Sequence, residues 1–274
     1  MAWYRKITIK TADELKIMRA AGKINAEALQ AAYKMIRPGV TTADINAAAE
    51  EVLRKYGVTS PFMNYPGPYP YPASTNVSIN DELVHGIPGK RKVKNGDIVS
   101  VDCGTTYEGF VADSAFTAPA GEVSPEAMRL LKVTEQAMYA GIEKMRAGNR
   151  VGDVSYAVQQ YAEKHGYYVT REYTGHGVGR MMHEGPQVPN YGIPGRGVEL
   201  QPGMVIALEP MILVGTERTR VCPDEWTVVT ADGSLCCHWE HSVAVTENGP
   251  LILTRLENGE SPAQIAGQPG VEQV

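Results

Sequence analysis

The segment KMIRPGVTTADINAAAEEVLRKYG, residues 34–57, decides the fold, because a related segment, KMRAGNRVGDVSYAVQQYAEKHG, follows at residues 144–166. With a shift of 109, Gly39 coincides with Gly148, and the glycines that end the two segments coincide as well. Each copy has the pattern of a turn, an amphipathic helix and a glycine stop, and a strand-rich stretch follows each. Chance similarity between two amphipathic helices is the alternative explanation. The repeat predicts two similar α+β halves that share one sheet.

The rest of the chain extends this pattern. Thr11 with Glu14 three residues later is typical of a capped helix start, and Ser124 before Pro125 is another. Helices are therefore expected from about residue 11, from Thr41 or Thr42 to Gly57, over about 125–146, and from about Asp153 to His165. Apolar or alternating runs predict strands at 77–80, 97–118, 204–214, 226–230 and 241–246. The predicted fold class is α+β, with helices covering one face of a mainly antiparallel sheet.

Composition narrows the class of function. The chain has 274 residues, 43% of them apolar and 21% charged, with a net charge of −5. The short basic run at 90–94 reads as a solvated turn, so DNA or RNA is not the implied substrate. The start has no apolar targeting segment, and no apolar run is long enough to cross a membrane. These features predict a cytoplasmic protein.

The four cysteines do not predict a disulfide framework, because two of them, Cys236 and Cys237, are adjacent and the chain is long. The stretch CCHWEH, 236–241, lacks the second spaced pair typical of a cysteine-ligated zinc site. We expect these thiols to be small core or pocket residues.

Four carboxylates stand in apolar strand patterns: Asp102, Asp113, Glu209 and Glu240. A single buried carboxylate costs several kcal/mol unless it is paired, so one alone could anchor an ion pair. Histidine is the only basic residue type within three positions of any of the four. A cation shared by all four carboxylates therefore explains their positions better than four separate ion pairs do.

The stretch YTGHGVGRMMHEGP, 173–186, supplies a nitrogen ligand. Glycines around His176 suit a phosphate cradle, a metal ligand, an acid or base, or only a tight turn. No strand-to-helix context with a following Lys supports phosphate binding. Four carboxylates and one imidazole suit Mn²⁺, Fe²⁺, Co²⁺ or Zn²⁺. They are enough for two ions about 3.5–4 Å apart.

Five motifs resemble one known family in order and spacing. They are NDELVHGIP, VSVDCGTTYEGFVAD, GHGVGRMMHEGPQVPN, ALEPM and HWEHSVAVT. Over about residues 10–250 the chain resembles the type I methionine aminopeptidases. The resemblance implies the pseudo-two-fold "pita-bread" fold, in one domain over 1–255 with halves of about 10–120 and 121–250. A polar tail, 256–274, would follow.

The resemblance assigns metal-binding roles to the five ligands. Asp102 would chelate one metal, Asp113 and Glu240 would bridge the pair, and His176 and Glu209 would complete the second metal. The cofactors would be two divalent ions, Co, Mn, Fe or Zn. Glu209 would also act as the general base for the bridging water.

Further site residues follow from the same resemblance. His183 would contact the scissile peptide, and His85 would help to stabilise the tetrahedral intermediate. Both would also bind substrate.

The methionine pocket would be walled by Trp226 and Tyr71, with Met182 where an aromatic residue often occurs. Tyr65 and Asn76 stand where cysteine is common in the family. These changes leave methionine as the expected side chain but alter the pocket wall.

Two weaker implications remain. Backbone carbonyls of Asn80, Glu82 and Cys236 would hold a monovalent cation, Na⁺ or K⁺. The proline-rich stretch PGPYPYP, 66–72, replaces a more varied loop, and a polyproline II recognition segment is the alternative reading.

The implied activity is removal of the initiator methionine from nascent proteins whose second residue is small. Partners would be nascent N-termini and the ribosome surface near the exit tunnel, with no DNA or membrane, and the enzyme would be a monomer. An X-Pro peptidase of the same fold is the first alternative, although His85 comes too early for the usual extra N-terminal domain. The gap of 26 residues from His183 to Glu209 is too short for the helical insertion of type II enzymes. A catalytically inactive binding module is the second alternative, and loss of ligands would mark it.

Overall fold

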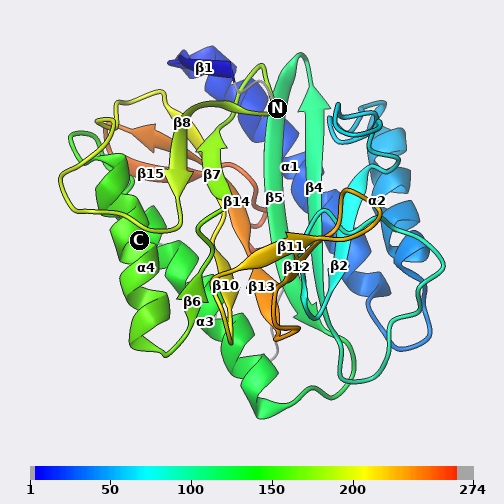
Figure 1. Cartoon of the computed structure of the whole chain (residues 1–274). Coiled ribbons are helices and arrows are strands. Elements are labelled where there is room, and N and C mark those ends of the chain that lie inside the picture. The colour runs from blue at the N-terminus through cyan, green and yellow to red at the C-terminus, as the bar shows by residue number, and fades with distance from the viewer. Residues whose placement is uncertain (1–3, 264–274) are drawn as a thin grey trace.

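The computed structural model describes residues 4–263, and its centre is a curved nine-stranded sheet (Figure 1). The strand order is β1–β8–β7–β9–β14–β5–β4–β2, with β15 paired to β14, and all these pairs are antiparallel except β1–β8. The strands are β1 (Tyr4–Ile7), β2 (Thr75–Ile79), β4 (Ile98–Tyr107), β5 (Phe110–Pro119), β7 (Thr174–Gly177), β8 (Glu184–Pro189), β9 (Val205–Leu208), β14 (Glu240–Thr246) and β15 (Gly249–Ile252). The predicted α+β, mainly antiparallel sheet is confirmed.

Four helices pack against this sheet within the described residues. They are α1 (Ala12–Met35), α2 (Thr42–Tyr56), α3 (Pro125–Ile142) and α4 (Val151–Lys164). In Figure 1, α1 runs behind β4 and β5, whereas α3 and α4 accompany the other end of the sheet. The Thr11 side chain caps α1 in the predicted capping box, and Ser124 caps α3. Large side chains such as Phe116, Leu130 and Met138 are fully buried in the core between helices and sheet.

The repeated segments adopt the same local structure. Asp44 in α2 and Asp153 in α4 each accept a hydrogen bond from the backbone N–H three residues earlier, at 2.8 and 2.7 Å. Gly39 and Gly148 precede the two helices with φ values of 96° and 88°, a conformation that side chains disfavour. This correspondence accounts for the pseudo-two-fold arrangement of the helix pairs.

Two small sheets flank the main one. The first is β13 (Cys236–His238), β10 (Met211–Leu213) and β6 (Tyr168–Val169). The second is β11 (Thr219–Val221), β12 (Val228–Thr230) and β3 (Glu82–Val84), and its strands β11 and β12 cross in front of the main sheet in Figure 1.

Three of the differences between the predicted and observed elements have a clear local cause. The run 97–118 is a hairpin, because Glu108 and Gly109 turn the chain with φ values of 47° and 77°. The run 204–214 is broken between β9 and β10 at Glu209 and the proline after it, since proline has no N–H for the ladder. α3 ends at Ile142, where the following residues form tighter i→i+3 turns.

Two further sequence predictions concern the polar tail and the absence of a membrane-spanning segment. The predicted polar tail extends beyond the described residues, which end at 263. Within the described part, no helix has the length and apolar character needed to span a bilayer.

Candidate metal and substrate site

Strand register brings three predicted ligands onto one face of the sheet. Asp102 on β4 and Glu240 on β14 both lie opposite Ala115 on β5, one on each side of it. Asp113 lies two residues before Ala115 on the same strand. Because side chains alternate between faces along a strand, all three carboxylates project to the same side.

The other two predicted ligands, His176 and Glu209, are placed on the same face by the register of β9 with its neighbours. His176 on β7 lies opposite Ala207, and Ala207 lies opposite Ser242, two residues beyond Glu240. Glu209 follows β9 two residues after Ala207. The same alternation therefore directs His176 and Glu209 toward the carboxylates from β4, β5 and β14.

The glycines beside His176 serve close strand packing. A Cβ on Gly175 would lie 2.7 Å from the carbonyl oxygen of Ala207, and one on Gly177 would collide with the carbonyl of Gly185. Strands β8 and β9 approach β7 this closely only because the positions on either side of His176 have no side chain.

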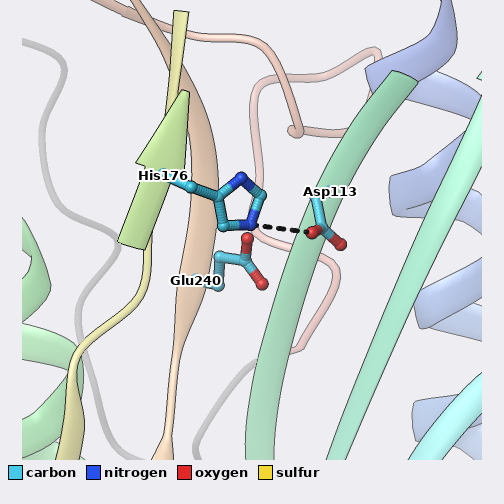
Figure 2. Close-up of side chains that lie close together, drawn as sticks. All are labelled: Asp113, His176 and Glu240. Carbon is cyan, nitrogen blue, oxygen red and sulfur yellow. Dashed lines mark ion pairs between the residues drawn. The ribbon is translucent and has the colours of Figure 1, made fainter. Parts of the chain in front are cut away.

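The ligand atoms form a compact group. Atoms of Asp113, His176 and Glu240 lie within 4.8 Å of one another, and the Nε2 atom of His176 is 3.7 Å from Asp113 Oδ2 (Figure 2). The same Nε2 is 3.4 Å from Glu209 Oε1, and the Asp102 carboxyl lies beside that of Asp113. His176 Nδ1 is 2.9 Å from the Gly177 carbonyl oxygen, which fixes the ring with Nε2 toward the group.

The four carboxylates, Asp102, Asp113, Glu209 and Glu240, are called the carboxylate cluster below. Burial raises the pKa of Asp102 to about 7. Burial first, and then the negative charge of its neighbours, raises the pKa of Asp113 well above its ordinary value. The same two causes act in the same order on the pKa values of Glu209 and Glu240. Together these acids destabilise one another when ionised.

The cluster fits a bound cation. Among the described residues, no Lys or Arg forms an ion pair with any of the four carboxylates. Asp102 Oδ1, Asp113 Oδ1 and Glu240 Oε1 are buried without a hydrogen-bond donor in the described part of the chain. Buried carboxylate oxygens normally have partners, and a set of oxygens with one imidazole nitrogen suits divalent metal ions.

A cavity of 370 Å³ opens onto the cluster, and every residue predicted for catalysis, for binding the divalent metals or for binding substrate lines it. They are Tyr65, Tyr71, Asn76, His85, Asp102, Asp113, His176, Met182, His183, Glu209, Trp226 and Glu240. The structure therefore places them in one site, and their individual roles remain predictions.

His183 lies next to the metal-binding group. Its ring centroid is 4.4 Å from that of His176, and its Nδ1 is 2.6 Å from the Tyr65 hydroxyl oxygen. Burial, together with the neighbouring imidazoles of His176 and His85, lowers the pKa of His183 to about 2. His183 is therefore neutral near pH 7, and Tyr65 holds its ring in one orientation. This hydrogen bond was not predicted.

His85 faces the cluster from the end of β3 in a left-handed backbone conformation, with φ of 61°. Such a conformation costs a non-glycine residue about 1–3 kcal/mol and persists where the surroundings impose it. Its ring packs against Tyr173 and Trp226, with centroids 6.0 and 6.2 Å apart. Burial lowers its pKa to about 4, so the imidazole is neutral.

One end of the cavity is apolar. Phe62, Tyr71, Met182 and Trp226 belong to one buried cluster, and Tyr65 packs against it. These five residues are called the aromatic wall. The ring centroid of Trp226 lies 5.1 Å from that of Tyr71.

The proline-rich stretch 66–72 forms the outside of this wall. The Tyr69 ring lies 6.2 Å from Trp226, and its hydroxyl donates to the carbonyl oxygen of Asp224 at 2.9 Å. Asn76 lines the cavity as well, but its Nδ2 donates to Asp102 Oδ2 at 2.8 Å, so it also orients a predicted metal ligand.

His238 is a site residue that was not predicted from the sequence. Its Nε2 lies 3.7 Å from Glu209 Oε2 and 3.9 Å from Glu240 Oε2, buried and without a hydrogen-bond partner among described residues. The signal was present, because His238 precedes Glu240 by two residues and strand alternation places both on one face. The adjacent thiols of Cys236 and Cys237 are free and belong to no ligand group found in the described chain.

The predicted monovalent-cation site stays a prediction. Cys236 N–H donates to the Asn80 carbonyl oxygen at 3.0 Å, so the two residues lie side by side. The Glu82 side chain accepts a hydrogen bond from Ile79 N–H at 2.8 Å.

The fold and the site define a metal-dependent peptidase, and comparison with known proteins identifies the family. Residues 16–247 match the model of metallopeptidase family M24, so the chain belongs to metallopeptidase family M24. The particular relatives are methionine aminopeptidases. The one from Clostridium acetobutylicum is 50% identical over 252 residues, which is 92% of this chain and all of the relative.

Solved structures agree with this. The chain matches the methionine aminopeptidase of Thermotoga maritima with a TM-score of 0.88 and 46% identity, over 91% of this chain and 99% of that one. The prolidase of Pyrococcus horikoshii has a TM-score of 0.72 at 23% identity, over 91% of this chain and 64% of that one, and shows the shared fold alone. The predicted pita-bread fold and family are confirmed.

Proposed function

We propose that this chain removes the N-terminal methionine from nascent polypeptides whose second residue is small, by hydrolysis of the first peptide bond. One observation carries the proposal: a carboxylate cluster with no Lys or Arg partner among residues 4–263 lies beside an apolar wall in a single cavity. The full-length similarity to methionine aminopeptidases supports the choice of substrate.

The cluster and His176 would hold two divalent ions. Asp102 would bind one, Asp113 and Glu240 would bridge, and His176 with Glu209 would bind the other. When bound, the ions would polarise the scissile carbonyl and lower the pKa of a water molecule toward neutrality. The donor set accepts Co, Mn, Fe or Zn, and availability decides among them.

Glu209 is the proposed general base. Its side chain is 14% exposed, whereas those of Asp113 and Glu240 are 3% and 2% exposed. It therefore has more access to the cavity than Asp113 or Glu240. Glu209 accepts a proton from the attacking water and delivers it to the nitrogen of the leaving amine.

His183 and His85 are the proposed hydrogen-bond donors to the peptide. Burial keeps both imidazoles neutral, so each can donate one N–H to the substrate without adding a buried charge. Donors fixed in place stabilise the oxyanion as it forms at the carbonyl. Tyr65 acts as a positioning residue, because its hydroxyl is hydrogen-bonded to His183.

The aromatic wall selects the first side chain. Methionine is unbranched and flexible, and its sulfur gains about 0.3–1.5 kcal/mol from contact with aromatic rings. The wall closes this end of the cavity, so the substrate enters with its free N-terminus first. This geometry explains why the enzyme would cleave only the first peptide bond of a chain.

The cellular setting follows from this substrate. We place the protein in the cytoplasm as a monomer that acts on chains leaving the ribosome, near the exit tunnel. A monovalent cation bound by backbone carbonyls near Asn80 would complete the cofactors.

The test uses protein stripped with a chelator and then supplied with Mn²⁺, Co²⁺ or Fe²⁺. We expect metal-dependent release of methionine from Met-Ala-Ser and no cleavage of Ala-Pro-Ala. Cleavage of Ala-Pro-Ala alone would assign an X-Pro peptidase. No turnover of either peptide by metal-loaded protein would favour a binding module.

A further inference from the structure

A second cavity, of 1130 Å³, lies at the outer edge of the main sheet. It is formed by the start of α4, the strand β8 and the loop that follows β8, which swings out beyond the sheet edge in Figure 1. We call it the edge groove and define it by Val151, Ser155, Pro189, Tyr191, Ile193 and Val198.

The edge groove is continuous with the catalytic cavity. Gln187 lines both, and its position opposite His176 in the strand register puts its side chain on the catalytic face. A second junction is made by Arg171, which lines the groove, and Glu172, which lines the catalytic cavity. A peptide that leaves the catalytic cavity on this side therefore runs directly into the groove.

The surface of the groove is apolar. Ile193 is 68% exposed, and Tyr191 and Val198 are each 37% exposed. Two arginines, Arg171 and Arg196, also line the groove. The Arg171 guanidinium is already occupied, because it lies 4.4 Å from the Tyr191 ring centroid and pairs with Glu217 at 3.0 Å. Exposed apolar side chains gathered on one feature are typical of a binding surface for another apolar group.

The β8 edge is open along the groove. Among the described strands, β1 pairs with β8 only at Glu184 and Gly185. Beyond these residues, Pro186 and Pro189 have no N–H to offer an added strand. Side-chain burial, more than backbone pairing, would therefore hold a chain in the groove.

We propose that the edge groove binds the part of the substrate polypeptide downstream of the scissile bond and favours apolar side chains there. This inference rests on the proposed function. The methionine fills the closed end of the cavity, so the rest of the chain must leave by the open side. An extended chain advances about 3.3–3.6 Å per residue, so residues several positions after the cut bond would lie on the groove.

The experiment compares three peptides. They are Met-Ala-Ser, an eight-residue peptide that extends it with Leu and Phe, and an eight-residue peptide that extends it with Gly and Glu. We expect kcat/KM for the apolar octapeptide to exceed that for the tripeptide about tenfold, through KM, because burial of one or two apolar side chains has this magnitude. The Gly and Glu extension should give little gain.

Variants locate the effect. Ile193→Ser and Val198→Ser should each remove about threefold or more of the apolar gain and leave tripeptide hydrolysis unchanged. Leu251→Ser is the matched control, since Leu251 is 47% exposed on β15 and lines neither cavity. An equal loss in the control, or no gain from the apolar extension in the natural protein, would overturn the proposal.

A second measurement avoids turnover of long peptides. The methionine-free seven-residue product should inhibit tripeptide hydrolysis at lower concentration than Ala-Ser does, and Ile193→Ser should abolish the difference. Absence of tripeptide hydrolysis in the natural protein would instead refute the proposed function. If the natural protein is a dimer that Ile193→Ser separates, the groove is an interface between copies and the substrate proposal is wrong.

Discussion

Among the buried carboxylates of this molecule, Glu184 and the carboxylate cluster have opposite surroundings. Glu184, 1% exposed, forms an ion pair with Lys10 at 2.9 Å and accepts hydrogen bonds from the Thr8 hydroxyl and from the Met181 N–H at 3.1 Å. The carboxylate cluster, carried by β4, β5, β14 and the residue after β9, has no Lys or Arg partner among the described residues.

The difference appears in the pKa values. Burial acts to raise the pKa of Glu184, but its hydrogen bonds from Lys10 and Thr8 and the charge of Lys10 outweigh burial and lower the pKa. In the carboxylate cluster burial prevails, and the pKa of Asp102 is raised to about 7. The Glu184 site is complete within the protein, whereas the cluster has the ligands for a cation from outside. The complete site is structural, and it anchors the residue directly after His183.

The largest expected effect is a loss of activity on substitution in the carboxylate cluster. Glu209→Gln should lower kcat about 10³-fold, because the amide cannot accept the proton that the base removes. The fold should be unchanged, since the amide has nearly the same shape. Methionine release measures activity and circular dichroism measures folding, so the two measurements together separate a loss of catalysis from a loss of structure. Activity within tenfold of the natural protein would show that Glu209 is not the base.

At the Lys10–Glu184 pair, a substitution is expected to lower the stability of the fold. Lys10→Met should destabilise the protein by about 3–5 kcal/mol, because Glu184 would be left as a buried charge without its partner. Lys16→Met is the control, since the Lys16 side chain is 77% exposed and solvent screens its pair with Asp13, so little loss of stability is expected. Urea unfolding of both variants gives the comparison. Equal stability of the two would contradict the structural role of Lys10.

The two sites should also respond to pH with opposite signs. The folded pKa of Asp102 lies above its ordinary value of 3.8, so its contribution to stability is complete below that value and is lost as pH rises toward about 7. The folded pKa of Glu184 lies below its ordinary value of 4.5, so its contribution is present above 4.5 and is lost on acidification.

The measurement is thermal unfolding of metal-stripped protein between pH 4 and pH 8. Asp102→Asn should become relatively more stable than the natural chain as pH rises, and Mn²⁺ should remove this difference. An advantage of Asp102→Asn that is constant with pH would contradict the raised pKa.

The smallest expected effect concerns the alignment of His183. Tyr65→Phe should lower kcat about threefold to tenfold through loss of one hydrogen bond, with metal content unchanged. Tyr69→Phe removes a hydroxyl bonded on the outside of the wall and should leave kcat unchanged. A similar loss in both variants would argue for general damage to the wall.

Local signals made much of this molecule predictable. The repeated segment predicted the helix pairs, because capping residues and glycines act over a few positions. The predicted ligands stood out because a carboxylate in an apolar strand violates burial preferences wherever its strand lies. The apolar pattern predicted a continuous strand run over 204–214, whereas the structure has two strands with a break at Glu209. An apolar pattern alone does not show where such a break lies.

Residues that act through distant partners could not be predicted. Lys10 and Glu184 are 174 positions apart, so nothing local pairs them. Tyr65 and His183 are separated by 118 positions. The edge groove likewise depends on how α4 packs beside β8. His238 is different, because its spacing from Glu240 was a local signal.

The most direct test of the account is a titration of Mn²⁺ into stripped protein, with bound metal and methionine release from Met-Ala-Ser measured in the same samples. The account predicts no release without metal, a rise in activity as the cluster fills, and saturation at about two ions per chain. Undiminished methionine release by protein that holds no metal would contradict it, because the carboxylate cluster would then have no cation to explain it.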